Sequence, residues 1–256
     1  MAGSKGATSR SVAYCGPAGD LPYSAGCKEL IISGVKAAES PPSVAVLLFG
    51  DRILPGPLTG LPAQRVADPA DTNVMDTVIG ACHRLVVVGA DADLAAVLTR
   101  LLRTERLDIE VGYAPPRRTP ATRVYRLPGG RRAARRAWRG SARRVPLIRD
   151  ETGSVIVGRA DWLPAGEPAL IHGEAVVDDT TLFDGDVAGV RIEPTLAMPG
   201  LRAALHGPRL WRRWLPGRAA QLGTTGASVI RDGVPAPRTV RRSTFYRHVE
   251  GWLLVR

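Results

Sequence analysis

The sequence has few cysteines, few aromatic residues and no long apolar run, and each shortage removes a class of protein. Three cysteines among 256 residues, without metal-ligand spacing, indicate neither a disulfide framework nor a zinc module. The longest apolar runs, residues 44–49 and 85–88, fall far short of the ~20 residues that cross a bilayer. No apolar stretch follows the basic residues near the N-terminus, so we expect no secretory signal and predict a soluble cytoplasmic protein.

Lysine is equally scarce. Only three of the 35 basic residues are lysines, so the formal net charge of +11 comes almost entirely from arginine. The 28 glycines and 21 prolines point to a GC-rich coding bias, which explains a preference for arginine but not a lack of acids. Residues 111–149 contain twelve arginines and no Asp or Glu, so this segment alone carries more charge than the whole chain. The rest of the sequence is therefore close to neutral.

Three roles are consistent with the arginine-rich segment. Arginine binds phosphate oxygens in pairs, which predicts an anionic ligand such as a nucleotide phosphate or an acidic lipid, and allows contact with a membrane surface. The simpler explanation is a solvated helix face. RNA binding is the third and is less favoured, because three Phe and five Tyr offer little stacking surface. Residues 131–139 are predicted to be helical, and from them we select Arg131 and Arg135 as candidate phosphate ligands.

Periodicity predicts an α/β unit in the first half of the chain. Residues 1–42 are rich in Gly, Ser, Ala and Pro and are expected to be a loosely ordered lead-in. After them, buried-type strands alternate with amphipathic helices, which is typical of a small parallel α/β domain over residues 43–128. The strands are predicted at 43–49, 84–88 and 107–112, and the helices at 72–82 and 91–103.

The second half of the chain is predicted to be rich in β-structure. Residues 129–144 form the arginine-rich linker helix, and residues 145–256 form a β-rich domain, so the fold class is α/β plus β. Residues 145–148 and 154–158 flank a hairpin turn, and one helix is expected at 199–214. Further strands are predicted at 169–172, 187–192, 227–231, 239–246 and 252–255.

One strand–turn–helix segment resembles a known family. Residues 85–97 read Leu-Val-Val-Val-Gly-Ala-Asp-Ala-Asp-Leu-Ala-Ala-Val, similar to the Gly-Gly-Asp-Gly-Thr segment of diacylglycerol kinases, sphingosine kinases and NAD kinases. The acidic stretch 178–187 and the late turn 231–235 resemble two further family features, in the same order along the chain. The resemblance covers residues 43–256. It implies an α/β domain followed by a β domain, ATP and Mg²⁺ as cofactors, and phosphoryl transfer to a lipid hydroxyl.

The resemblance also implies the site residues. The nucleotide-binding turn corresponds to Gly89, Ala90, Asp91, Ala92 and Asp93. Asp91 is the candidate catalytic residue. Asp179 and Asp184 are candidate metal ligands that would assist it.

Several departures from the family pattern favour a divergent member. Ala90 and Ala92 add methyl groups where glycines let the backbone approach phosphate, and Asp93 places a carboxylate where the family has a hydroxyl. Val234 stands where lipid kinases carry a glutamate, and an aliphatic side chain cannot accept a proton. The family's early Asn-Pro-x-Ser-Gly loop is replaced by Phe-Gly-Asp-Arg at 49–52.

Three hypotheses follow. The first, which the departures favour, is a relative with impaired or no lipid phosphorylation that binds a nucleotide or anionic lipid between its two halves. The second is an active ATP-dependent lipid kinase. The third and least favoured is a basic protein that binds RNA or a protein partner. The acids also have ordinary structural explanations, since Asp91 and Asp93 suit a helix N-terminus and Asp184 and Asp232 precede glycines in turns.

Overall fold

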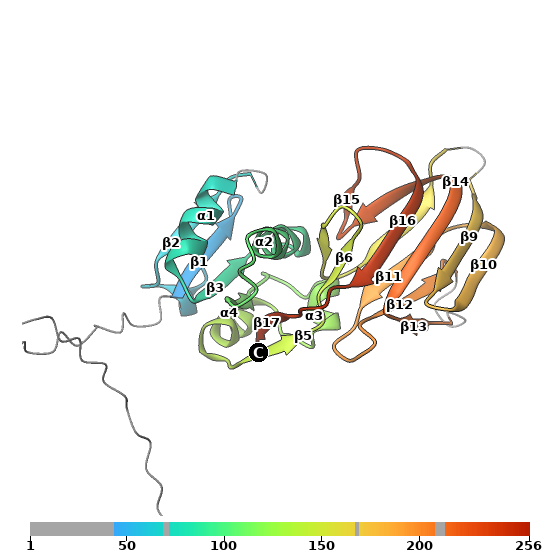
Figure 1. Cartoon of the computed structure of the whole chain (residues 1–256). Coiled ribbons are helices and arrows are strands. Elements are labelled where there is room, and N and C mark those ends of the chain that lie inside the picture. Colours follow the sequence, from blue (N-terminus) through green and yellow to red (C-terminus); the bar gives the residue numbers. More distant parts are fainter. Residues whose placement is uncertain (1–43, 69–71, 167–168, 208–212) are drawn as a thin grey trace, which may run out of the picture. The chain divides into compact units, whose positions relative to one another are not determined.

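The computed structural model describes residues 44–68, 72–166, 169–207 and 213–256. The predicted lead-in, residues 1–42, lies outside them. Two sheets organise the described residues (Figure 1). The first has six strands in the order β2-β1-β3-β4-β17-β5, all parallel except β5. Their bounds are β1 Val44–Phe49, β2 Ala63–Val66, β3 Arg84–Val88, β4 Glu110–Tyr113, β5 Ala142–Val145 and β17 Trp252–Val255.

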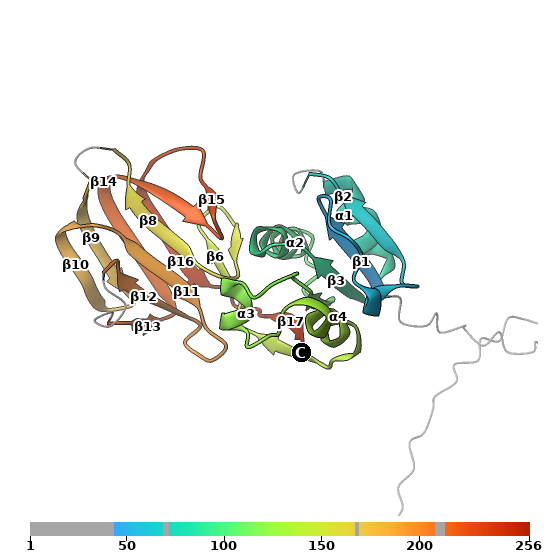
Figure 2. The same cartoon turned by 180° about the vertical axis from the view of Figure 1, so that it is seen from behind.

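Alternate side chains of the first sheet enter two different apolar layers. Leu85 and Val87 face one core with Leu47, beneath helices α1 (Thr72–Ala81) and α2 (Asp91–Arg103). Val86 and Val88 point to the opposite face, which the alanines of α4 (Gly130–Arg139) cover. A strand buried on both faces reads as a continuous apolar run, which is why the sequence predicts β1 and β3 well. Figures 1 and 2 show the helices on the two sides of this sheet.

The second sheet has eleven strands, and its paired strands are antiparallel. Its main path is β13-β12-β11-β8-β14-β16-β6-β7, and the long strand β14 (Ala219–Arg231) also pairs with β9 and β15. Trp162 and Phe245 lie at its core with ring centroids 5.9 Å apart. The remaining bounds are β6 Ile148–Asp150, β7 Val155–Ile156, β8 Ala160–Pro164, β9 Ile171–Val177, β10 Thr180–Val187, β11 Val190–Pro194, β12 Leu201–Leu205, β13 Leu215–Gly217, β15 Val234–Pro235 and β16 Val240–Arg247.

The α/β-plus-β prediction is confirmed, and the helix expected at 199–214 is wrong. Strand β12 occupies residues 201–205 of that segment, residues 208–212 lie outside the described residues, and β13 begins only after the segment, at Leu215. Leu, Ala and Arg favour helix, but Leu201 and Ala203 are fully buried in β12, which pairs with β11 and β13. Burial in a sheet outweighs a preference worth only a few tenths of a kcal/mol, roughly, per residue.

The C-terminal strand also departs from expectation. Trp252–Val255 is a strand as predicted, but it pairs with β4 and β5 of the first sheet and not with the β-rich half. Its buried Trp252 meets Tyr125 edge-on, with centroids 5.3 Å apart. The last strand therefore returns to the α/β half. No helix in the part of the chain that the structure describes is long and apolar enough to span a bilayer.

Candidate functional site

The turn between β3 and α2 is hydrogen-bonded to a carboxylate of the protein itself, that of Asp93. Ala90 occupies the N-cap position, and its backbone amide donates to Asp93 Oδ2 at 2.7 Å. A Cβ atom on Gly89 would lie 2.6 Å from that same oxygen, so only glycine fits at this position. The Arg52 guanidinium lies 3.5 Å from Asp93 Oδ2 and donates to the carbonyl of Phe49 at 2.7 Å. The Asp93 carboxylate therefore occupies the N-terminus of α2, where the helix dipole favours negative charge.

Asp91 is buried and both of its carboxylate oxygens are hydrogen-bonded within the protein. The hydroxyl of Tyr113 donates to Oδ1 at 2.8 Å, and the backbone amide of Ala121 donates to Oδ2 at 3.0 Å. Ala121 belongs to the short helix α3 (Pro120–Val124), so Asp91 fixes α3 against α2. Burial, with the neighbouring Asp91 charge, raises the pKa of Tyr113, which therefore stays a donor.

Asp232 forms a second carboxylate bridge from the turn after β14. It lies at a positive φ of 48°, and its oxygens accept hydrogen bonds from the backbone amides of Val157, Gly158 and Arg159 at 2.9, 2.7 and 2.9 Å. Burial raises the pKa of Asp232 to about 6, the three amide donors oppose that rise, and the Asp91 charge adds to it. This carboxylate orders the chain at the entry to β8.

Gly158 lies between the two carboxylates. A Cβ atom there would be 2.8 Å from Asp91 Oδ2, 2.9 Å from Asp232 Oδ1 and 2.9 Å from Pro120 Cβ. Glycine is therefore required where α2, α3 and the second sheet approach each other. Asp91, taken from the sequence as the candidate catalytic residue, thus lies in a packed junction with Asp232.

The described residues do not fit a Mg²⁺ ion at this turn. The oxygens of Asp91 face N–H and O–H donors, and Asp93 is bonded to Ala90 and faces Arg52. Asp179 and Asp184 are exposed on the β9/β10 hairpin, where Asp184 pairs in register with Glu174. That hairpin joins the sheet through β14, whereas α2 packs on β7. Among the described residues, no group of three or more His, Cys, Asp or Glu could hold a metal ion.

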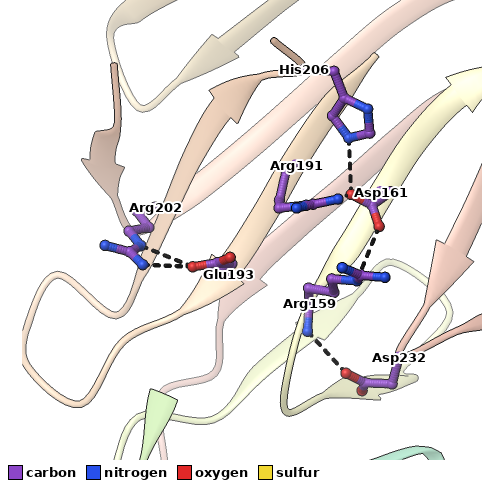
Figure 3. Close-up of polar contacts among 7 residues, drawn as sticks. All are labelled: Arg159, Asp161, Arg191, Glu193, Arg202, His206 and Asp232. Carbon is purple, nitrogen blue, oxygen red and sulfur yellow. Dashed lines mark hydrogen bonds and ion pairs between the residues drawn. The ribbon is translucent and has the colours of Figure 1, made fainter. Parts of the chain in front are cut away.

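The second sheet carries a network of charged side chains that was not predicted from the sequence (Figure 3). Asp161 on β8 is almost fully buried, and its carboxylate accepts from Arg191 Nε at 2.8 Å and lies 3.0 Å from His206 Nε2 and 3.4 Å from Arg159 Nε. Next to it, Glu193 accepts from Arg202 at 2.6 and 3.2 Å. The spacing of these charges is the signal that could have revealed them. Charged residues two apart on a β-strand, such as 191 and 193 on β11, point to one face, and Arg159 directly precedes β8, two residues before Asp161.

This network borders a cavity of about 620 Å³ between α3 and the second sheet. The walls carry five arginines and one glutamate, together with apolar groups that include Leu196 and Ala197. Arg202 lies over the ring of Trp214, 4.1 Å from its centroid, so one charged group is held against an aromatic wall. The charged lining residues are Arg123, Arg126, Arg159, Arg191, Glu193 and Arg202. We call this cavity the cleft.

The two arginines selected from the sequence lie in different surroundings. Arg135 lines a larger, open cavity of about 960 Å³, whereas Arg131 is not among its lining residues. The Arg131 Nη2 atom instead lies 3.6 Å from where a Cβ on Gly56 would be, beside the short 3₁₀ turn η1 (Gly56–Leu58). None of residues 89–93 lines the larger cavity. The structure thus separates Arg135 from the candidate turn.

Comparison with solved structures identifies the fold. A diacylglycerol kinase from Bacillus anthracis str. Sterne superposes with a TM-score of 0.64 over 84% of this chain and 96% of that chain, at 11% identity. The chain has the fold of diacylglycerol kinases and NAD kinases. An NAD kinase from Archaeoglobus fulgidus in complex with ATP gives 0.55 over 83% and 93% of the two chains, at 12% identity.

Yeast NADH kinase complexed with NADH gives a TM-score of 0.53 over 85% of this chain and 84% of that chain, at 10% identity. No protein-family profile matches the sequence. No curated protein matches it either. At identities this low the likeness establishes the kinase-like fold, and the predicted resemblance is confirmed at the level of the fold.

Proposed function

We propose that this kinase-fold protein binds an anionic, partly apolar ligand and does not transfer a phosphoryl group. One observation carries the second half of this proposal, the absence of phosphoryl transfer, above all others. Asp91, which the resemblance makes the catalytic residue, is buried and hydrogen-bonded to Tyr113 and Ala121. A carboxylate in that state is closed to metal and substrate, so it acts as a structural bridge.

Two further features support the absence of phosphoryl transfer. Asp93 fills the helix N-terminus with a charge that would repel a phosphate unless a cation lay between them. Val234 is 54% exposed in the late turn, where lipid kinases carry a glutamate. An exposed valine offers no general base for deprotonating a lipid hydroxyl.

The lining of the cleft supports the choice of ligand. Five arginines suit a phosphate or carboxylate group, and Leu196, Ala197 and Trp214 offer apolar surface beside them. An anionic lipid combines both properties, and a nucleotide combines phosphate with a flat apolar base. The solved structures of this fold in complex with ATP and with NADH are consistent with a phosphate-bearing ligand.

The competing function is an active ATP-dependent lipid kinase, which the fold alone also allows. Thermal unfolding of the full chain separates the two. Short-chain phosphatidic acid is expected to raise the melting temperature, while ATP is expected to give the same result with Mg²⁺ as without it. Stabilisation by ATP that requires Mg²⁺ and is lost in Asp91→Asn would support the kinase instead.

A filled cleft provides the site-specific control. Ala197→Trp places a large ring at the exposed lip of the cleft and is expected to reduce the stabilisation by phosphatidic acid. Val249→Trp makes a similar change at a residue that is 98% exposed and outside the cleft lining, so it should behave as wild type. Equal stabilisation of wild type and Ala197→Trp would contradict binding in the cleft.

A further inference from the structure

The larger cavity is lined by eight arginines and by no Asp or Glu. It is an open basin of about 960 Å³ formed by α3, the loop that follows it, α4 and Arg256. Its arginines are Arg118, Arg123, Arg126, Arg132, Arg135, Arg136, Arg139 and Arg256. We call this surface the arginine basin. Arg123 and Arg126 also border the cleft, whereas the four arginines of α4 do not.

Helix α4 turns one complete arginine face toward the basin. Residues 132, 135, 136 and 139 have the spacing of one face of a helix. Ala133, Ala134 and Ala137 form the opposite face and are buried against the first sheet. A Cβ on Gly112 would lie 2.6 Å from the carbonyl oxygen of Ala137, so the helix lies very close to the sheet. This close packing fixes the direction of the arginine face.

The arginines of the basin lack acidic partners, unlike several arginines elsewhere in the described residues. Elsewhere, Arg84 pairs with Glu110, Arg191 with Asp161 and Arg231 with Asp150. None of the eight basin side chains has a hydrogen bond or ion pair with any residue that the structure describes. Arg139 only stacks on Trp138, with its guanidinium carbon 4.4 Å from the ring centroid. Eight arginines therefore line one hollow that has no Asp or Glu in its lining, and a bound anion would relieve the repulsion among them.

We propose that the arginine basin binds a compact ligand that carries two or more phosphate groups. Guanidinium groups bind phosphate oxygens in bidentate pairs, and several guanidiniums match several phosphates better than they match one. A single-stranded nucleic acid fits less well, because no lining residue is aromatic and bases would have nothing to stack on. The phosphates could belong to a free polyphosphate or to a lipid head group. This site does not depend on the function proposed for the cleft, and an active kinase could contain it too.

Titration calorimetry with inorganic tripolyphosphate tests the free-ligand form. Saturable binding is expected, and the double variant Arg132→Glu/Arg136→Glu should weaken it by about tenfold or more, because two charge-assisted contacts become repulsive. The control Arg241→Glu/Arg242→Glu makes the same charge change at exposed arginines of β16 outside the basin and should bind as wild type. Citrate, a trivalent anion without phosphate, should bind more weakly than tripolyphosphate.

Vesicle sedimentation tests the lipid form. Phosphatidylcholine vesicles with a minor fraction of phosphatidylinositol bisphosphate are compared with pure phosphatidylcholine vesicles. Binding to the vesicles that contain phosphatidylinositol bisphosphate, but not to tripolyphosphate, assigns the phosphates to a lipid. Binding to tripolyphosphate, but not to these vesicles, assigns them to a free ligand. In both cases Arg132→Glu/Arg136→Glu must lose the binding. Arg132 and Arg136 are exposed, so circular dichroism should show that this variant is folded, and Arg132→Gln/Arg136→Gln should give a smaller loss. No binding in either arm, or equal binding by wild type and the double variant, overturns the proposal.

Discussion

The hydroxyl of Tyr113 donates a 2.8 Å hydrogen bond to the carboxylate of Asp91, and both residues are buried. Tyr113 ends β4 and Asp91 begins α2, so this bond ties the C-terminal end of β4 to the helix that follows β3. The second oxygen of Asp91 holds the start of α3 through Ala121. Asp91 therefore connects three elements of the fold.

Removal of the Tyr113 hydroxyl should destabilise the protein. Tyr113→Phe leaves one oxygen of a buried carboxylate without its donor, which costs about 1–3 kcal/mol of unfolding free energy. Urea denaturation followed by circular dichroism measures the change. Tyr125→Phe removes another buried tyrosine hydroxyl, one that makes none of the Asp91 hydrogen bonds, and should cost less. Equal costs for the two variants would show that the bond to Asp91 contributes little.

Asp232 should give the protein a distinctive dependence on pH. Its pKa is about 6 in the folded protein against 3.8 ordinarily, so the folded state binds more protons than the unfolded state between these values. The contribution of Asp232 to stability is therefore present at low pH and is lost as pH rises from about 4 to about 6. Wild type should lose stability relative to Asp232→Asn over this window, by at most about 3 kcal/mol.

Urea denaturation of both proteins at several pH values measures that difference. The comparison with Asp232→Asn matters because the carboxyl of Asp108, beside Arg106, has a lowered pKa and contributes with the opposite sign. This contribution is common to both proteins and cancels. A difference that stays constant between pH 4 and 6, or that grows in favour of wild type, would contradict a raised pKa for Asp232.

Gly89 and Asp93 should be energetically coupled. Gly89→Ala places a methyl group 2.6 Å from Asp93 Oδ2, an overpacking that should cost about 1–3 kcal/mol. Asp93→Ala removes the capping carboxylate and should cost about 1 kcal/mol. The double variant should cost less than the two single variants added together, because the second change removes the close contacts with Oδ2 and Cγ of Asp93 and leaves only the contact with its Cβ at 2.8 Å. A double-mutant cycle in urea tests this, and strict additivity would mean that the two groups do not interact.

Local patterns predicted the elements of the α/β half well. Helix α2 begins at Asp91 and ends at Arg103 as its apolar spacing and terminal charges indicate, and β1 and β3 match their apolar runs. The helix predicted around β12 was wrong, because the composition of this segment favours helix while pairing with β11 and β13 makes it a strand. Pairing between distant segments carries no local signal.

The site was harder to predict than the fold. Sequence identified Asp91 and Asp93 as acids at a helix start, but not the donors that bind Asp91, since Tyr113 and Ala121 are 22 and 30 residues away along the chain. The sequence indicates only a turn residue at Asp232, although its carboxylate accepts hydrogen bonds from three backbone amides of the segment that leads into β8. Helical periodicity could have grouped Arg135 with residues 132, 136 and 139, apart from Arg131.

Transfer of phosphate from ATP tests the central claim, that Asp91 is a structural bridge and not a catalytic group. Full-length protein is incubated with radiolabelled ATP, Mg²⁺ and dispersed diacylglycerol, and labelled phosphatidic acid is separated and counted beside the Asp91→Asn variant. Circular dichroism first establishes that the variant is folded. We predict that wild type forms no more phosphatidic acid than Asp91→Asn does. Product formed by wild type and lost in the folded variant would contradict the account and make Asp91 the catalytic residue of a lipid kinase.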